Sequence, residues 1–229
     1  LELGDTIVAG RYDAAITGVE LRNLAVFKEK IYDEIKEIPG KLIVKEYPTR
    51  SANIQTIKNH VEKLKRRDFT PDMIIVDYGD LIRPENGGKD EKRHQLETIY
   101  EELRGLAQIC ECPLWTASQT NRSGLNAEVI TMESISEAFN KCFVADFIFT
   151  VSRTVEDKNN NTGRIFIAKN RNGPDGLVYP LFMDTSSVCI KVLSQTGETV
   201  NDIIQKSSKD RLEALKEKYK VFKKEGGKG

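Results

Sequence analysis

The sequence has no net charge: 35 Lys and Arg residues balance 35 Asp and Glu residues. A neutral total neither favours nor excludes a nucleic-acid partner, because local charged patches decide such binding. Long apolar runs and a secretory leader pattern are also missing, so no segment is expected to enter a membrane. With 229 residues, the chain is long enough for one substantial hydrophobic core.

Cysteine and histidine are scarce. The four cysteines are irregularly placed, and the spacing of Cys110 and Cys112 fits neither a zinc motif nor a redox motif. Disulfide frameworks are typical of smaller secreted chains, so reduced thiols in a cytoplasmic protein are expected. His60 and His94 are expected on helix surfaces, and neither is assigned a metal.

A complete phosphate-binding loop of the form G-x-x-x-x-G-K-[ST] is absent as well. Three stretches, 39–42, 87–90 and 227–229, contain Gly and Lys but lack the required spacing and the following Ser or Thr. None of them is expected between a strand and a helix. The sequence starts with Leu1 rather than Met, so we expect an internal fragment of a longer protein.

What the sequence does contain is an alternation of helical and strand patterns. Apolar stripes of helical period predict helices over 24–38, 51–64 and 96–106. Strands separated by helices early, and strands in succession late, predict an α/β fold whose mostly parallel sheet is flanked by helices and finished by antiparallel hairpins. The polar stretch 157–163 is the expected tip of one hairpin. The expected strands are 41–47, 73–76, 114–118, 147–151, 164–168, 178–182 and 188–193.

The end of the chain differs in character. Residues 206–229 hold nine basic and four acidic residues. We therefore expect a domain over 1–195 and a basic, partly helical or disordered tail over 196–229. The tail is either a solvated, frayed segment or a docking helix for a partner protein or the nucleic-acid backbone. The apolar face of that possible helix comprises Leu212, Leu215, Tyr219 and Phe222.

Two strand ends carry side chains that suit nucleotide chemistry. Asp77 follows the apolar run 73–76, and the carboxyl edge of a parallel sheet is where Mg²⁺ and phosphates bind in nucleotide-hydrolysing α/β domains. A carboxylate there can hold Mg²⁺ through water. Gln119, at another strand end, suits a sensor that hydrogen-bonds a γ-phosphate. Each has a plainer alternative, because many buried strands end in Asp and Gln119 could cap a loop.

A third strand end carries two cations, Lys169 and Arg171. Residues spaced by two on a strand point to the same face, so both cations are expected to converge on one site. This arrangement suits an arginine finger that stabilises charge on a transferring phosphoryl group. The alternative is a basic edge strand that prevents aggregation. The ordered set of three strand ends favours an ATP-driven motor, with ATP and Mg²⁺ as cofactors.

Four segments together resemble the RecA-like ATPase domain of DnaB-type hexameric replicative helicases, including the phage versions. Residues 1–3 are similar to the end of the family's Ser-Leu-Glu-Met segment, and 75–78 resemble its Walker B segment Ile-Asp-Tyr-Leu. Residues 116–122 are similar to Ala-Leu-Ser-Gln-Leu-Asn-Arg. The most specific match is 167–174, Ile-Ala-Lys-Asn-Arg-Asn-Gly-Pro, against the family's Ile-Ala-Lys-Gln-Arg-Asn-Gly-Pro. The resemblance covers roughly 1–193.

The resemblance implies a role for each matching residue. Glu2 becomes the base that activates the attacking water, and Gln119 becomes the γ-phosphate sensor. Lys169 and Arg171 become a pair that reaches into a neighbouring subunit's site, so the working unit is a homo-oligomeric ring, by resemblance a hexamer. The implied cofactor-binding residues are Asp77, which also holds Mg²⁺ through water, Tyr78, Asn172 and Gly173.

Two departures from the family pattern affect what this chain can do. The family's phosphate-binding loop lies upstream of the Glu2 segment, so we expect that it was removed with the N-terminal part and that this fragment binds ATP poorly. The family's strand-contacting segment Asp-Leu-Arg-Glu-Ser-Gly corresponds to 134–139, where its Arg is not kept. Loops at 83–93 and 121–141 are either DNA-contacting or ordinary solvated loops. The DNA-binding candidates are Lys89, Arg93, Arg122, Glu137 and Lys141.

The sequence therefore predicts the motor domain of a replicative DNA helicase, acting in the cytoplasm of a bacterium or of a phage-infected cell. Single-stranded DNA is the expected partner, and a primase, loader or polymerase could bind the tail. Two alternatives stay open. One is a recombinase-type or regulatory RecA-like ATPase, and the other is a non-catalytic RecA-like interaction subunit.

Overall fold

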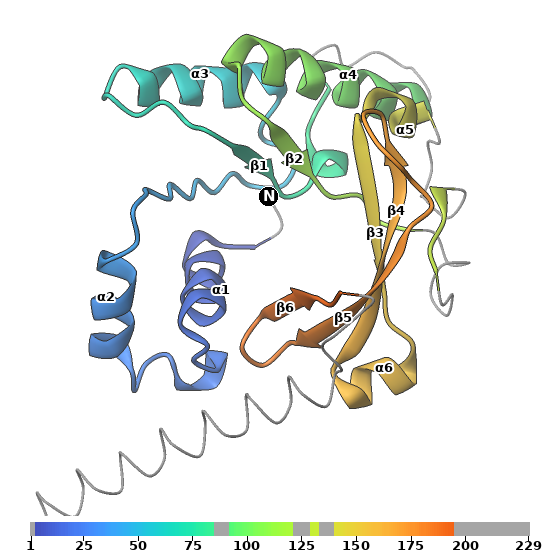
Figure 1. Cartoon of the computed structure of the whole chain (residues 1–229). Helices are drawn as coiled ribbons and strands as arrows, with labels where there is room; N and C mark the ends of the chain where they lie inside the picture. The colour runs from blue at the N-terminus through green and yellow to red at the C-terminus, as the bar shows by residue number, and fades with distance from the viewer. Residues whose placement is uncertain (1–2, 85–91, 121–128, 133–139, 195–229) are drawn as a thin grey trace, which may run out of the picture.

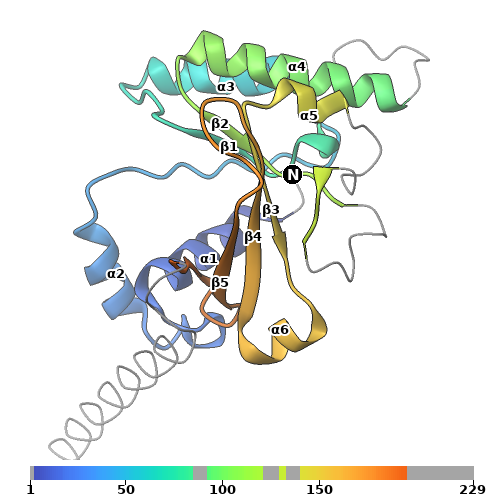
Figure 2. The same cartoon turned by 45° about the vertical axis from the view of Figure 1, so that its right-hand side comes forward.

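The fold combines a short parallel strand pair, two helices that cover one face of it, and a longer antiparallel sheet (Figure 1). The parallel pair has the order β1-β2 and the antiparallel sheet the order β3-β4-β5-β6. Figure 2 shows α1 and α2 beside the far end of the antiparallel sheet, away from α3 and α4. The computed structural model describes residues 3–84, 92–120, 129–132 and 140–194.

The elements alternate along the chain much as the patterns predict. The helices are α1 (Asp5–Thr17), α2 (Lys28–Lys36), α3 (Ile54–Lys65), α4 (Lys92–Cys110), α5 (Asn140–Val144) and α6 (Val155–Asn160). Two short 3-10 turns are η1 (Leu21–Asn23) and η2 (Gly79–Leu81). The strands are β1 (Ile74–Val76), β2 (Leu114–Thr116), β3 (Phe147–Ser152), β4 (Thr162–Asn170), β5 (Val178–Asp184) and β6 (Cys189–Val192). None of the helices in these described segments is long and apolar enough to cross a membrane.

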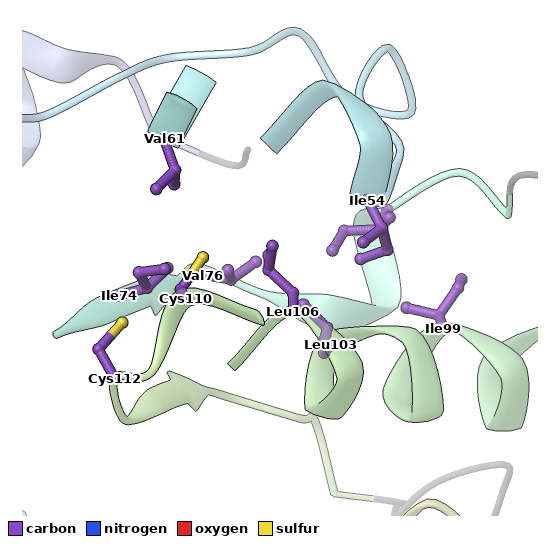
Figure 3. Packing of buried hydrophobic residues seen from close by; sticks show 10 residues of the cluster. Ile54, Val61, Ile74, Val76, Ile99, Leu103, Leu106, Cys110 and Cys112 are labelled. Atoms are coloured by element: carbon purple, nitrogen blue, oxygen red, sulfur yellow. The ribbon is translucent and has the colours of Figure 1, made fainter. Parts of the chain in front are cut away.

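The main core lies between the parallel pair and α3 and α4 (Figure 3). Ile74 and Val76 point into it from β1, while Ile99 and Leu106, each 1% exposed, point into it from α4. Burying one such side chain contributes about 2 kcal/mol to folding. The opposite face of the pair is more open, because Ile75 is 58% exposed. The parallel pairing places Val76 and Thr116, the last residues of β1 and β2, side by side at the carboxyl edge.

The antiparallel sheet follows the chain order expected from successive strands. Ile148 of β3 lies opposite Lys169 of β4, so the end of β4 lies beside the start of β3. Figure 1 shows this end of the sheet next to α5, with α6 at the other end. The β3–β4 hairpin is confirmed, but α6 occupies most of its expected tip, because Thr154 and Asp157 form a capping box that starts a helical turn.

One expected strand is absent. Residues 41–47 belong to no helix or strand and join neither described sheet, so the prediction of a strand there was wrong. An alternating pattern is not sufficient, because a strand also needs a neighbour for its backbone hydrogen bonds. The parallel part is correspondingly small: among the described strands, one pair is parallel and three pairs are antiparallel.

Helix positions agree more closely with the sequence patterns. The helix expected from Ser51 begins at Ile54, because Asn53 caps it by accepting a hydrogen bond from the Thr56 backbone. Three helices, α1, α5 and α6, were not predicted; α5 and α6 have only five and six residues. The expected tail over 196–229 lies outside the described residues.

Candidate functional site

The carboxyl ends of β1 and β2 are tied together by one hydroxyl group. Thr116 Oγ1 donates to the Val76 carbonyl at 2.9 Å and accepts from the Gly79 backbone N–H at 2.8 Å. A Cβ on Gly79 would lie 3.2 to 3.3 Å from Thr116, Leu103 and Tyr100 side-chain atoms, so η2 packs this closely because position 79 has no side chain. The chain after β1 is thereby held against β2 and α4.

Three predicted nucleotide-site residues lie at these strand ends. The Gln119 side-chain amide donates to the Tyr78 hydroxyl at 2.8 Å, although 41 residues separate them in sequence. Asp77 directly precedes Tyr78 and is exposed to solvent. Gln119 is also exposed. An exposed carboxylate and an amide therefore share one edge of the parallel pair, as the strand-end argument predicted.

Lys169 and Arg171 form a second cluster, at the end of β4 against α5. The Lys169 ammonium donates to the Cys142 carbonyl at 2.8 Å and the Phe143 carbonyl at 3.0 Å. Arg171 Nη2 donates to the same Phe143 carbonyl at 3.4 Å. The expected convergence of the two cations is confirmed, and its local cause is the C-terminal end of α5, where backbone carbonyls attract positive charge.

Asp146 fixes the orientation of Arg171. Its carboxylate pairs with Arg171 at 2.7 Å and with Arg104 of α4 at 2.9 Å. The Arg171 backbone N–H also donates to the Asp146 carbonyl at 2.9 Å, so chain and side chain are both held. Burial, and then the charge of Arg171, lower the pKa of Lys169 below its ordinary value. About half of the Arg171 side chain is nevertheless exposed, at 47%.

Asn172 and Gly173 lie in the exposed turn that follows β4. The Asn170 side chain organises this turn: its oxygen accepts from the Asn172 N–H at 3.3 Å, and its Nδ2 donates to the Pro174 carbonyl at 3.3 Å. A Cβ on Gly173 would lie 2.7 Å from Asn170 Nδ2, which is too close for a real contact. The Lys-Asn-Arg-Asn-Gly-Pro sequence therefore builds a compact turn that presents Arg171.

Lys141, expected to contact DNA, lies inside the protein instead. Its side chain is 2% exposed, and its ammonium contacts Asp80 at 3.2 Å and donates to Ser118 Oγ at 2.5 Å. It also lies 5.5 Å from the centre of the Tyr100 ring. An ammonium enclosed in this way cannot reach a nucleic-acid phosphate, so the predicted role of Lys141 is corrected to an internal one.

Several other predicted residues lie outside the described part of the chain. These are Glu2, Lys89, Arg122 and Glu137, together with the side chain of Arg93. Sequence reasoning also missed partners of the site. Asp80 lies two residues after Tyr78, and its charge so close to a strand end was a usable signal. Tyr100, Arg104 and Asp146 gave no comparable signal, because their roles depend on contacts between distant segments.

The donor chemistry at the β1 end fits a magnesium ion that is shared with phosphates. Asp77 offers an exposed carboxylate, which is the kind of hard oxygen ligand that Mg²⁺ prefers. Among the described residues, no group of three or more His, Cys, Asp or Glu side chains is placed to hold a metal. Mg²⁺ beside a nucleotide is usually held by one or two carboxylates together with waters and phosphate oxygens, so Asp77 alone is a suitable protein ligand for this ion.

The sequence of this chain is similar to those of replicative helicases from a phage and from a bacterium. A DnaB-like replicative helicase of Enterobacteria phage T4 is 31% identical over 167 residues, which are 68% of this chain and 35% of that protein. The replicative DNA helicase DnaB of Geobacillus stearothermophilus is 29% identical over 141 residues, which are 59% of this chain and 31% of that protein. The chain thus spans about a third of the length of these curated relatives.

Solved structures confirm the RecA-like α/β fold. The ATPase domain of G40P matches with a TM-score of 0.70 at 17% identity, over 84% of this chain and 72% of that one. A DnaB-like replicative helicase, described with its interactions with primase, matches with a TM-score of 0.69 at 17% identity, over 84% of this chain and 50% of that one. The model of the DnaB-like helicase C-terminal domain matches residues 12–188. The chain therefore belongs to the DnaB-like helicase C-terminal domain family.

Proposed function

We propose that this chain is the motor domain of a replicative DNA helicase. In this proposal, ATP hydrolysis between neighbouring subunits of a ring drives movement along single-stranded DNA and separation of the duplex. Family membership supports the helicase class over the recombinase-type alternative. It does not by itself distinguish a working motor from a non-catalytic RecA-like subunit, so the proposal depends on the site.

One observation carries the proposal: Gln119 is hydrogen-bonded to Tyr78 beside Asp77, at the carboxyl end of a parallel strand pair. This is the edge at which α/β domains bind nucleotides. A carboxylate for Mg²⁺ and an amide for a terminal phosphate are both exposed there. The two exposed groups, which the Gln119–Tyr78 hydrogen bond brings to one edge, support a nucleotide site.

Each residue then has a distinct task. Mg²⁺-ATP, when bound, supplies the phosphoryl group and the metal charge that offsets its negative oxygens. With that group bound, Asp77 would hold the metal through water, and Gln119 would bind the terminal phosphate and lose this partner after hydrolysis. Glu2 accepts a proton from the attacking water. Tyr78 holds the Gln119 amide at 2.8 Å, ready for that contact.

The cation pair acts on the neighbouring subunit. Lys169 and Arg171 are held by α5 and Asp146 rather than by the Asp77 edge, and Arg171 is 47% exposed. A cation that is positioned but still accessible suits a finger that stabilises charge in another subunit's site. Hydrolysis then depends on subunit docking, which couples chemistry to movement of the ring. The exposed turn with Asn172 and Gly173 presents the pair and contacts the nucleotide from that side.

The proposal extends to cofactors and partners. ATP and Mg²⁺ are the cofactors, a homo-hexameric ring is the assembly, and the setting is the cytoplasm of a bacterium or a phage-infected cell. The chain holds no phosphate-binding loop of the form G-x-x-x-x-G-K-[ST], so this chain alone should bind ATP poorly. Single-stranded DNA contacts the predicted loops at 83–93 and 121–141, and a primase, loader or polymerase binds the basic tail. The remaining DNA-contacting candidates are Lys89, Arg93, Arg122 and Glu137.

Hydrolysis of ATP by the longest reading frame that contains this chain tests the function. We expect activity that single-stranded DNA stimulates and that Asp77→Asn abolishes. Asp33→Asn is the matched control, because Asp33 is a 65% exposed partner of Lys36 on α2. A folded, assembled protein that hydrolyses no ATP would refute the motor and favour the non-catalytic interaction subunit.

A further inference from the structure

A buried lysine joins α5 to the strand ends of the nucleotide site. The Lys141 ammonium contacts both Asp80 oxygens, at 3.3 and 3.2 Å, and donates to Ser118 Oγ at 2.5 Å. Tyr100 closes the cluster, because its hydroxyl donates to Asp80 at 2.8 Å and its ring lies 5.5 Å from the ammonium. The three donors of the ammonium are thus satisfied by groups from other elements.

The partners of Lys141 lie directly behind the proposed sensor. Ser118 immediately precedes Gln119, and Asp80 follows Tyr78 by two residues. Ser118 Oγ and Asp80 Oδ2 lie 3.2 Å apart, so the two strand ends already contact each other. The strand ends are also held by the Thr116 hydroxyl and the β1–β2 pairing. They therefore have several attachments, of which Lys141 is only one.

The C-terminal end of α5 contacts the cation pair, Lys169 and Arg171. Its Cys142 and Phe143 carbonyls accept from Lys169, and the Phe143 carbonyl also accepts from Arg171. α5 has only five residues, and such a short helix has little stability of its own. Its position depends on packing against α4 and on the Lys141 contacts. A shift of α5 therefore moves the carbonyls that set the positions of Lys169 and Arg171.

We propose that Lys141 is a positioning residue: its ammonium fixes α5 against the strand ends and so sets where Lys169 and Arg171 project toward the neighbouring subunit. The inference rests on the proposed function and extends it to a residue that touches neither nucleotide nor DNA. Burying an ammonium is costly unless it is paired. The cluster of Asp80, Ser118 and Tyr100 offsets that cost and ties the cations to the strand ends of their own subunit.

Subunit mixing in the longest reading frame tests this assignment. Lys141→Met keeps an unbranched side chain of similar length but removes the charge. We expect kcat to fall about 10²-fold with KM nearly unchanged, as for misplaced catalytic groups. The variant damages only the part of each site that Lys169 and Arg171 supply. Mixing with Asp77→Asn subunits, which keep these cations intact, should therefore restore activity. Mixing with Arg171→Ala subunits should not, because both variants lack the same part.

The outcomes separate positioning from a general loss of structure. If neither partner restores activity, Lys141 has a purely structural role. If Arg171→Ala subunits restore activity, Lys141 serves the part of the site formed by Asp77 and Gln119. Either result overturns the inference. Arg164→Met is the stability control, because it removes a part-buried ion pair with Asp157 at 2.8 Å, far from α5 in sequence and contacts. It should keep kcat in the folded protein.

A second variant guards against misfolding. Lys141→Met combined with Asp80→Asn leaves no unpaired buried charge, so it should fold and show the same mixing pattern. Wild-type kcat in this double variant would overturn the inference. A wild-type protein without ATPase activity would overturn the proposed function and the inference with it, whereas an active wild type with the wrong mixing pattern would overturn the inference alone.

Discussion

Replacing Arg171 by Ala should separate catalysis from stability more clearly than any other single change. The side chain is 47% exposed and pairs with an Asp146 carboxylate that is itself 52% exposed. Ion pairs this exposed to solvent contribute about 0.5 kcal/mol. Asp146 also keeps its pair with Arg104 at 2.9 Å. The free energy of unfolding should therefore fall by less than about 1 kcal/mol.

The expected catalytic effect is much larger. Removing an arginine finger costs roughly 10³-fold to 10⁵-fold in kcat, which corresponds to about 4 to 7 kcal/mol of transition-state stabilisation. Nucleotide affinity should change little, because the Asp77 and Gln119 edge is untouched. The assay combines steady-state ATP hydrolysis, titration with a fluorescent nucleotide and urea unfolding of the longest reading frame that contains the chain.

Arg22→Ala is the matched control for this experiment. Arg22 makes a surface ion pair with Glu20 at the same 2.7 Å distance, and its side chain is 81% exposed. It should leave hydrolysis and nucleotide binding as they are. The reasoning is refuted if Arg171→Ala leaves kcat intact, or if it destabilises the protein by more than about 3 kcal/mol, a loss expected only for a buried pair.

Two further predictions concern pH. Burial and the charge of Arg171 lower the pKa of Lys169, so this side chain loses its charge at a lower pH than an ordinary lysine. Lys169→Arg should therefore move the alkaline limb of the pH profile of kcat to higher pH. An unmoved limb would contradict a role for that charge. Although burial raises the pKa of Asp157, hydrogen bonds from Thr154, Thr162 and Arg164 outweigh it and hold the pKa well below its ordinary value. The carboxylate therefore stabilises the fold above the ordinary pKa, and this stabilisation is lost as the pH falls toward the lower, folded-state value. Asp157→Asn should cost roughly 3 kcal/mol at pH 7 and less below about pH 4, measured by urea unfolding; an equal cost at both pH values would show that the charge is unimportant.

Local patterns could predict the strand ends because each signal lies within a few residues. The apolar run that ends at Asp77 is enough to predict a buried strand that stops there. The spacing of Lys169 and Arg171 likewise predicts a common face by strand alternation, although β4 ends at Asn170 and Arg171 lies in the turn after it. The two cations meet at the Phe143 carbonyl, where contacts with α5 and Asp146 hold them.

Lys141 shows where local reasoning fails. Lysine is almost never fully buried, so a lysine in a loop-rich segment is naturally interpreted as a solvent-exposed, DNA-contacting group. Its burial depends on contacts with Asp80, Tyr100 and Ser118, which all lie between 23 and 61 residues away from Lys141 in the sequence. The segment 41–47 fails for a related reason, because a strand depends on its neighbour as well as on its own alternation.

The most direct test of the shared site mixes two inactive proteins. Subunits with Asp77→Asn retain Lys169 and Arg171, and subunits with Arg171→Ala retain Asp77 and Gln119. If each site combines one subunit's strand edge with the next subunit's cations, a mixture should hydrolyse ATP although neither parent does. Mixed rings that form and remain inactive would contradict a site shared between subunits.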